Sequence, residues 1–450
     1  MNAIKKVLKH QTDISKTSIK DHHIASMMLQ KEYLHTIIKP HLKKSRNRLY
    51  GVEETLSMFV SQAIHPDRSC QNIVNHAALQ NPDRSIGTGG YCRARGRLNT
   101  DMIKQLSRSI AQEHERRLSD AWRWQKRDVY LIDGTTLIMS DTPANQEQYP
   151  QTSSLPEGVG FPICRLVGII SLGSGALIDA ELGSYHGKGA SEQALLRPML
   201  HHFKAGDIVL ADAFYSTYFL IAHMMHHKID ILFVQNGART RNTDFSKGVV
   251  LGKNDHLITL SKPKQKPEWM TQEAYDAAAE FLTIREFKAA GKILITTMTC
   301  ADTHHKKELG NLYKKRWHIE VDLRNIKTTM GLEKLSCKTP QMVIKELWVY
   351  FLAYNMIRSL MLASALYACV LPRMLSFKHT LQLVLAYQYN NIDIEILYRL
   401  ISKKKVGDRP GRIEPRVIKR RHRNDYRLMM KPRNILREEI RLNGHPKKLK

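Results

Sequence analysis

Hydrophobic positions along the chain change their spacing twice. Up to about residue 124 they recur with helical spacing, and from about residue 126 they follow the shorter period of β-strands. In this second part, three strands, a helix, a strand, a helix and a strand follow one another. The predicted strands are 128–140, 163–172, 176–184, 207–211 and 229–234, and the predicted helices are 191–203 and 215–227. This order predicts an α/β fold with a mixed sheet.

The helical period returns over 302–335, which the pattern predicts to be one uninterrupted helix. Asp302 or Thr303 can cap its start, and Gly331 can stop it. On a helical wheel one apolar stripe consists of Leu312, Ile319, Leu323, Ile326 and Met330. Beside it, within a sector of roughly 80°, lies a polar stripe that consists of Tyr313, Arg316, Glu320, Arg324 and Lys327.

This polar stripe has two interpretations. One acid among several cations suits a metal ion that lies next to a phosphate backbone. The acid would hold the metal, the arginines and Lys327 would hold phosphate oxygens, and the Tyr313 phenol could hydrogen-bond to those oxygens. The alternative is an exposed helix face on which Glu320 pairs with Arg316 and Arg324, four residues away on either side. For an arbitrary helix the second interpretation is favoured.

Two aspartates follow or interrupt predicted strands. Asp133 lies in the first strand, although Asp-Gly between apolar residues is also typical of a hairpin turn. Asp212 follows the apolar run 208–211, where ligands gather in α/β sheets, although it could equally be a helix cap. Asp207 is a rival candidate, but the Gly-Asp pair at 206–207 is better explained as the turn into that strand.

Composition points to an anionic partner. The chain of 450 residues carries a net charge of +28, and residues 401–450 contain 18 Lys and Arg against 5 Asp and Glu. Nucleic acid is the first expectation and an anionic membrane surface the second. Six scattered cysteines without CxxC spacing argue against a zinc finger or a disulfide framework and fit a reducing compartment. The apolar run 347–371 is interrupted by polar residues and predicts a buried helix rather than a membrane span.

Basic residues also cluster outside the α/β part. A glycine-rich turn at 87–90 leads into a short helix in which Arg93 and Arg97 share one face, suited to phosphate contact or simply to solvent. The tail 403–450 has several prolines and predicts a flexible basic arm. The expected regions are a helical N-terminal DNA-binding region 1–125, a catalytic domain 126–335 with a β-rich insertion at about 236–300, C-terminal helices 336–402, and the tail.

The spacing Tyr313-x2-Arg316-x3-Glu320-x6-Lys327 resembles the signature of DDE transposases of the insertion-sequence-four type. The resemblance continues through about residue 361, and the segment around Arg93 is similar to the N-terminal region of the same family, which binds terminal-repeat DNA. It implies a ribonuclease-H-like catalytic domain in which Asp133, Asp212 and Glu320 hold two Mg2+ ions, for which Mn2+ can substitute. It also implies an insertion that reaches over the DNA end, where Trp269 is a candidate for stacking on a flipped base. The alternative, which is favoured, is that Trp269 is an ordinary half-buried tryptophan.

The resemblance further implies an activity and its partners. The expected reaction is strand cleavage at the ends of an insertion sequence followed by joining to target DNA, without a covalent link to Tyr313. The partner would be double-stranded DNA with terminal inverted repeats, bound by a homodimer in the bacterial cytoplasm and associated with the nucleoid, with no membrane involved. Two alternatives remain, a metal-dependent nuclease without strand joining and a non-catalytic or domesticated DNA-binding protein.

Overall fold

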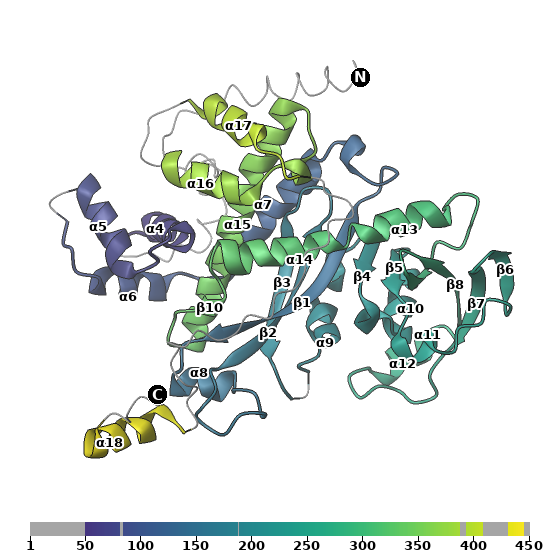
Figure 1. Ribbon diagram of the computed structural model, residues 1–450, viewed down its shortest axis with the longest axis horizontal. Coiled ribbons are helices and arrows are strands. Elements are labelled where there is room, and N and C mark those ends of the chain that lie inside the picture. Colours follow the sequence, from purple (N-terminus) through teal and green to yellow (C-terminus); the bar gives the residue numbers. More distant parts are fainter. Residues whose placement is uncertain (1–49, 82–83, 188, 388–392, 408–430, 445–450) are drawn as a thin grey trace, which may run out of the picture.

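One mixed sheet forms the centre of the molecule, in a computed structural model that describes residues 50–81, 84–187, 189–387, 393–407 and 431–444. Its strand order is β3-β2-β1-β4-β5-β9-β8-β7-β6, and the short β10 (Lys334–Leu335) pairs with β1 in addition. Helices flank the sheet on both faces (Figure 1). The predicted class, an α/β fold with a mixed sheet, flanking helices and a β-rich insertion, is confirmed.

The first five strands follow the predicted order closely. Apolar alternation produces β1 (Val129–Met139), β2 (Ile163–Ser171) and β3 (Leu177–Ser184), which pair as an antiparallel meander. The next strands, β4 (Ile208–Ala211) and β5 (Asp230–Val234), run parallel to β1. The carboxyl ends of β1, β4 and β5 therefore lie at the same edge of the sheet.

The insertion after β5 continues this sheet. Its strands are β6 (Val249–Gly252), β7 (Asp255–Ser261), β8 (Phe281–Ala289) and β9 (Lys292–Thr296). The short helix α11 (Gly237–Thr240) precedes β6, and α12 (Gln272–Ala277) lies between β7 and β8. Because β9 pairs antiparallel with β5, the insertion is an extension of the central sheet.

Each face of the sheet is covered by its own helices. One face packs against α7 (Thr100–Arg117), α14 (Trp317–Arg324) and α15 (Pro340–Ala368), whose apolar side chains share a core with alternate residues of β1. The other face packs against α9 (Glu192–Leu196), which continues as a 3-10 helix (Arg197–His202), and against α10 (Tyr218–His226).

The remaining helices lie around this core. In the N-terminal region α4 (Val52–Ile64), α5 (Cys70–Gln80) and α6 (Gly89–Arg97) enclose a small apolar cluster of their own, while α4 also packs on α15. Short helices cover Asp120–Trp122, Pro143–Gln148, Ala213–Tyr215 and Pro372–Met374, and α16 (Phe377–Tyr387) and α17 (Ile394–Lys403) pack on the C-terminal part of α15.

The helix predicted for 302–335 is not uninterrupted. It begins later, as α13 (Lys306–Lys314) with His305 as its cap, so the expected caps Asp302 and Thr303 are wrong. The backbone tightens to 3-10 hydrogen bonds around Lys315 before α14, and widens to a π-helical turn at Asn325–Thr329. Gly331 ends it with φ +77°, a conformation that favours glycine, as predicted. The two helices still run in one line across the sheet (Figure 1), and all five residues of the apolar stripe are buried.

The C-terminal region differs from expectation in one place. Helix α15 is long and apolar enough to cross a membrane, but 83% of its apolar window is buried inside the protein, so it is a core helix as predicted. The tail was predicted to lack regular structure, yet α18 covers Arg433–Asn443. The prediction is wrong there because Pro432 stands before the first turn, where proline is compatible with a helix. The basic runs at 409–412 and 419–423 lie outside the described residues.

Candidate active site

Two of the predicted acids lie side by side at the carboxyl edge of the sheet. In the parallel pair β1–β4, Leu131 is the partner of Leu210, so Asp133 and Asp212 each follow two residues beyond the same rung. Adjacent strands are about 4.8 Å apart, so this register brings the two carboxylates together. The rival Asp207 lies at the opposite end of β4, where its side chain accepts a hydrogen bond from the backbone N–H of Lys204 at 2.7 Å.

The structure excludes the alternative role of Asp133, a hairpin turn, but shows the alternative role of Asp212, a helix cap. Asp133 continues within β1 and is not part of a hairpin turn, because β1 runs on to Met139. Asp212 does cap the 3-10 turn that follows it, since its Oδ1 accepts a hydrogen bond from the N–H of Phe214 at 2.9 Å. That bond uses one carboxylate oxygen and orients the side chain without removing it from the edge.

Glu320 reaches this edge from α14 through Arg316. The Arg316 guanidinium lies 2.7 Å from Oε1 of Glu320 and 3.3 Å from Oδ2 of Asp133, so one cation bridges two of the three acids. Burial raises the pKa of Asp133 to about 6, against the opposing effect of Arg316, and the negative charge of Asp212 adds to the rise. The helical pairing of Arg316 with Glu320 is thus present, and it is part of the carboxylate cluster.

Other residues of the polar stripe hold the helix against the strands. The Tyr313 hydroxyl donates to the carbonyl of Ala211 at 3.4 Å, and burial raises the pKa of Tyr313 to about 12. That Tyr313 forms no covalent link to DNA stays a prediction. Lys327 donates to Thr135 Oγ1 at 3.1 Å and to the Thr136 carbonyl at 2.9 Å, which ties the π-helical turn to β1 just beyond Asp133.

The donor set fits a hard divalent cation. All three acids offer carboxylate oxygens, which Mg2+ and Mn2+ prefer. The Arg316 guanidinium lies between two of them and offsets their negative charge. Within the described residues, no three His, Cys, Asp or Glu side chains are already gathered as a ready-made metal cluster, so the acids would have to close around an ion and Arg316 would have to turn away.

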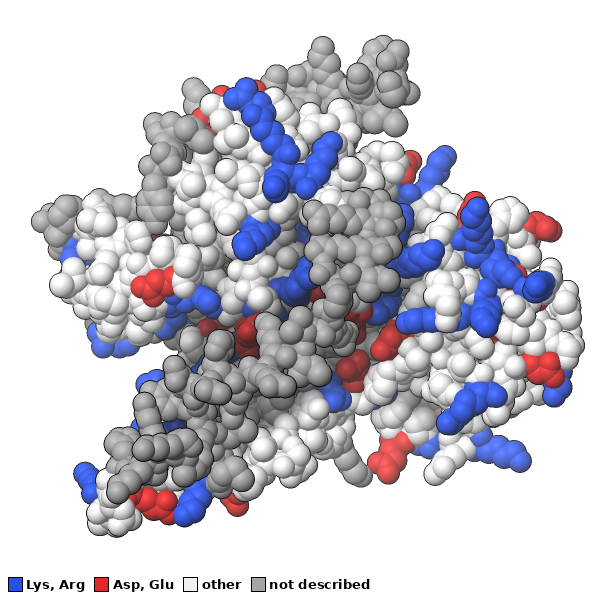
Figure 2. All heavy atoms as spheres, viewed as in Figure 1, with Lys and Arg blue, Asp and Glu red and all other residues white. Residues whose placement is uncertain are grey.

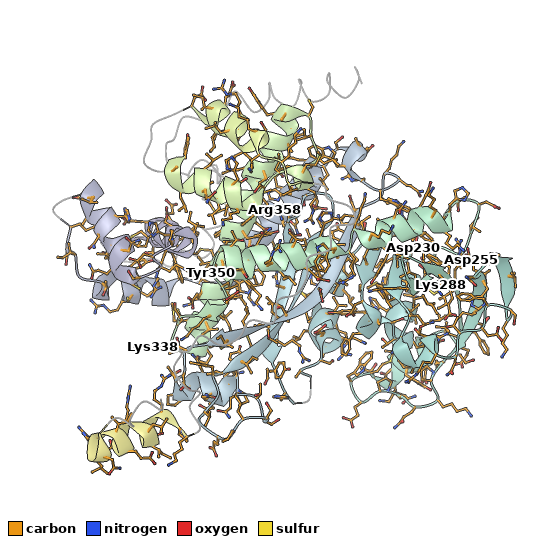
Figure 3. All side chains as sticks on the ribbon, viewed as in Figure 1. Asp230, Asp255, Lys288, Lys338, Tyr350 and Arg358 are labelled. Atoms are coloured by element: carbon orange, nitrogen blue, oxygen red, sulfur yellow. The ribbon has the colours of Figure 1, made fainter. Side chains whose placement is uncertain are left out.

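The sequence reasoning missed a buried ion network on the far side of α14. Asp322, fully buried, accepts hydrogen bonds from both Arg358 of α15 and Arg373. Figure 3 labels Arg358, which lies where α15 passes next to α14. The signal available in the sequence was a second acid two residues after Glu320, which must point to the other side of the helix.

The sequence reasoning also missed Glu192, the first residue of α9. Its carboxylate lies directly against Gly134, the residue after Asp133, and its Oε2 accepts a hydrogen bond from the Tyr215 hydroxyl at 3.1 Å. The only signal in the sequence was the glycine after Asp133, which leaves room for another side chain.

The remaining candidate DNA-binding residues lie on the surface and form none of the contacts described above for the three acids. Arg93 and Arg97 are exposed on α6, and Arg324 is exposed on α14. Trp269 is 50% exposed in the insertion, where the Arg197 guanidinium covers its ring at 3.9 Å from the centroid. Figure 2 shows Lys and Arg side chains over α13 and the insertion.

A mixed sheet with one acid on a strand, a second directly after the neighbouring parallel strand and a third on a helix that crosses the sheet is the architecture of a ribonuclease-H-like DDE domain. Comparison with known proteins agrees, because residues 124–356 match the family described as "Transposase DDE domain". The chain belongs to this family of transposases. It is 26% identical to "Transposase InsG for insertion sequence element IS4" of Escherichia coli (strain K12), over 84% of this chain and 87% of that protein. It is also 32% identical to "Putative transposase InsZ" of the same organism, over 30% of this chain and 45% of that protein. The predicted resemblance to transposases of the insertion-sequence-four type is confirmed.

Proposed function

We propose that this transposase cuts the ends of its insertion sequence and joins them to target DNA through Asp133, Asp212 and Glu320. The observation that supports this most is the β1–β4 register, which places the two aspartates at the same level of the same edge. The bridge from Arg316 then brings Glu320 of α14 to that edge. The three acids come from segments far apart in the sequence.

The acids would hold Mg2+, or Mn2+ in its place, which would supply charge neutralisation and a lowered pKa for the attacking water or 3′-hydroxyl. Arg316 would turn from its two carboxylates to a phosphate oxygen of the DNA, since a guanidinium binds phosphate in the same fork geometry as it binds carboxylate. Tyr313 and Lys327 would hold α13, α14 and β1 in position, and Arg324 is exposed and free to reach the DNA backbone.

The test is magnesium-dependent cleavage and joining of a labelled duplex that carries the element's own end. Glu320→Gln and Asp133→Asn should abolish cleavage while DNA binding persists, because the protein remains strongly basic. Glu333→Gln is the matched control, since Glu333 lies on the same segment, is exposed and bonds only to Thr328 among the side-chain hydrogen bonds that the structure describes. Cleavage without a joined product would favour a nuclease, and binding without cleavage in Mg2+ or Mn2+ would favour a DNA-binding protein.

The partners follow from this function. Two ends must be cut together, so we propose a homodimer on terminal inverted repeats, with the surface of α6 at the DNA. The protein would act in the bacterial cytoplasm, associated with the nucleoid. Sedimentation of the full chain with and without a duplex of the element's end should show dimers on the DNA.

A further inference from the structure

A fourth carboxylate lies within the candidate active site. Glu192 begins α9, whose cap Ser191 accepts a hydrogen bond from the N–H of Ala194. Its side chain extends under β1 to Gly134. A Cβ built on Gly134 would lie 2.3 Å from Cδ of Glu192 and 2.4 and 2.7 Å from its two oxygens, closer than real atoms approach. The carboxylate therefore occupies the space that any other residue after Asp133 would fill with its own side chain.

Hydrogen bonds hold this carboxylate at the Asp212 side of the edge. Tyr215, which is fully buried and lies three residues after Asp212, donates to Oε2 of Glu192. The neighbouring Gln193 donates to the carbonyl of Phe214 at 2.5 Å and accepts from the Thr217 hydroxyl at 2.9 Å. The first turn of α9 is thus bonded to the loop that follows Asp212, so Glu192 is fixed relative to both strand aspartates.

The charges around Glu192 are mostly negative. Burial and the neighbouring Asp212 raise the pKa of Glu192, which Tyr215 and Arg165 oppose, and Glu192 in turn adds to the raised pKa of Asp133. Arg316, the cation that bridges the cluster, contacts Asp133 and Glu320. Half-buried carboxylates repel one another unless a cation lies between them.

We propose that Glu192 is a fourth carboxylate of the same divalent-cation centre, and that it positions the ion bound by Asp133 and Asp212. This inference rests on the proposed function of those two residues. The competing explanation is structural, because an acid in the first turn stabilises a helix and Glu192 could serve only α9 and Tyr215.

Binding of Mn2+ to the full-length protein separates the two explanations, measured by calorimetry and by the rise in Tm on adding Mn2+. Glu192→Gln should weaken Mn2+ binding by about tenfold, a typical effect of residues around a metal site. Its Tm without metal should equal or exceed that of the wild type, because one of several repelling charges is gone. A lower Tm without metal together with unchanged Mn2+ affinity would show a structural role and overturn the proposal.

Two further variants keep the test valid if Glu192→Gln folds poorly. Gly134→Ala keeps every charge but displaces the Glu192 carboxylate, so it should also weaken Mn2+ binding. Tyr215→Phe keeps the carboxylate and removes only its anchor, so its effect should be smaller. Unchanged Mn2+ affinity in Gly134→Ala would contradict the proposal.

The same titrations separate this inference from the proposed function. If Asp133→Asn weakens Mn2+ binding and Glu192→Gln does not, the three-acid site stands and the fourth carboxylate is refuted. If Asp133→Asn also binds Mn2+ as the wild type does, the proposed site itself fails, and with it the inference.

Discussion

Replacing the buried Asp322 with Asn tests whether the ion pairs on the far side of α14 hold this helix in place. The Asp322 side chain is 0% exposed, and those of its partners Arg358 and Arg373 are 4% and 11% exposed. Removing the negative charge leaves two largely buried guanidinium groups without a counter-ion, and breaking a buried pair in this way costs about 3–5 kcal/mol. We expect Asp322→Asn to lower the free energy of unfolding by that amount.

Urea unfolding followed by circular dichroism measures the loss. Asp120→Asn is the control, because the Asp120 side chain is 68% exposed and pairs with Arg123 at the surface. Exposed pairs contribute about 0–1 kcal/mol, so this variant should unfold almost like the wild type. A loss below about 1 kcal/mol in Asp322→Asn would refute the reasoning, because it would mean that water or other groups compensate the two arginines. Adding Arg358→Met to Asp322→Leu should recover part of the stability, since apolar residues often replace buried ion pairs without loss.

Three other predictions concern pH, DNA affinity and base stacking. Burial lowers the pKa of His114 to about 3, and its ring is bonded to Ser359 at 2.6 Å. Because the folded pKa lies below the unfolded value, stability present above about pH 6.5 is lost on acidification, by about 2 kcal/mol at pH 5, and Tm against pH should fall less steeply in His114→Gln. Replacing Arg93 and Arg97 with Ala should reduce the slope of log affinity against log salt by about 1 for each phosphate that is no longer neutralised, and an unchanged slope would place α6 away from DNA. Trp269→Ala should weaken binding of the cut DNA end by about 1–3 kcal/mol while Trp269→Phe retains most of it, and equal affinities would exclude stacking.

The strands and the candidate acids could be predicted from the sequence because they depend on local patterns. Alternation of apolar residues located β1 to β5 to within a few residues. The same alternation placed Asp133 in a strand and Asp212 after one. The spacing around Glu320 then identified the helix that crosses them. Each of these inferences uses residues that are close in the sequence, so no knowledge of distant contacts was needed.

Features that depend on distant contacts could not be predicted. The pairing of β9 with β5, which turns the insertion into an extension of the sheet, joins segments about sixty residues apart. The π-helical turn at Asn325–Thr329 lies where Lys327 bonds to β1. A helical wheel drawn at a constant 100° per residue cannot represent this local change in the number of residues per turn. Glu192 was missed because its role depends on the space beside Gly134, which exists only in the folded chain.

The two sides of α14 explain how one helix could both belong to the core and take part in the proposed chemistry. On one side Asp322 is fully paired and inaccessible, so its arginines resist any rotation or sliding of the helix. On the other side Glu320 and Arg316 are partly exposed, and Arg316 contacts acids that would need a cation from outside the chain. Because Asp322 and its two arginines fix the helix, Arg316 can leave Glu320 and Asp133 without a change in the position of α14. Exchange of Arg316 for divalent ions would therefore require the movement of side chains, while the backbone that sets the distance between β1 and α14 stays in place.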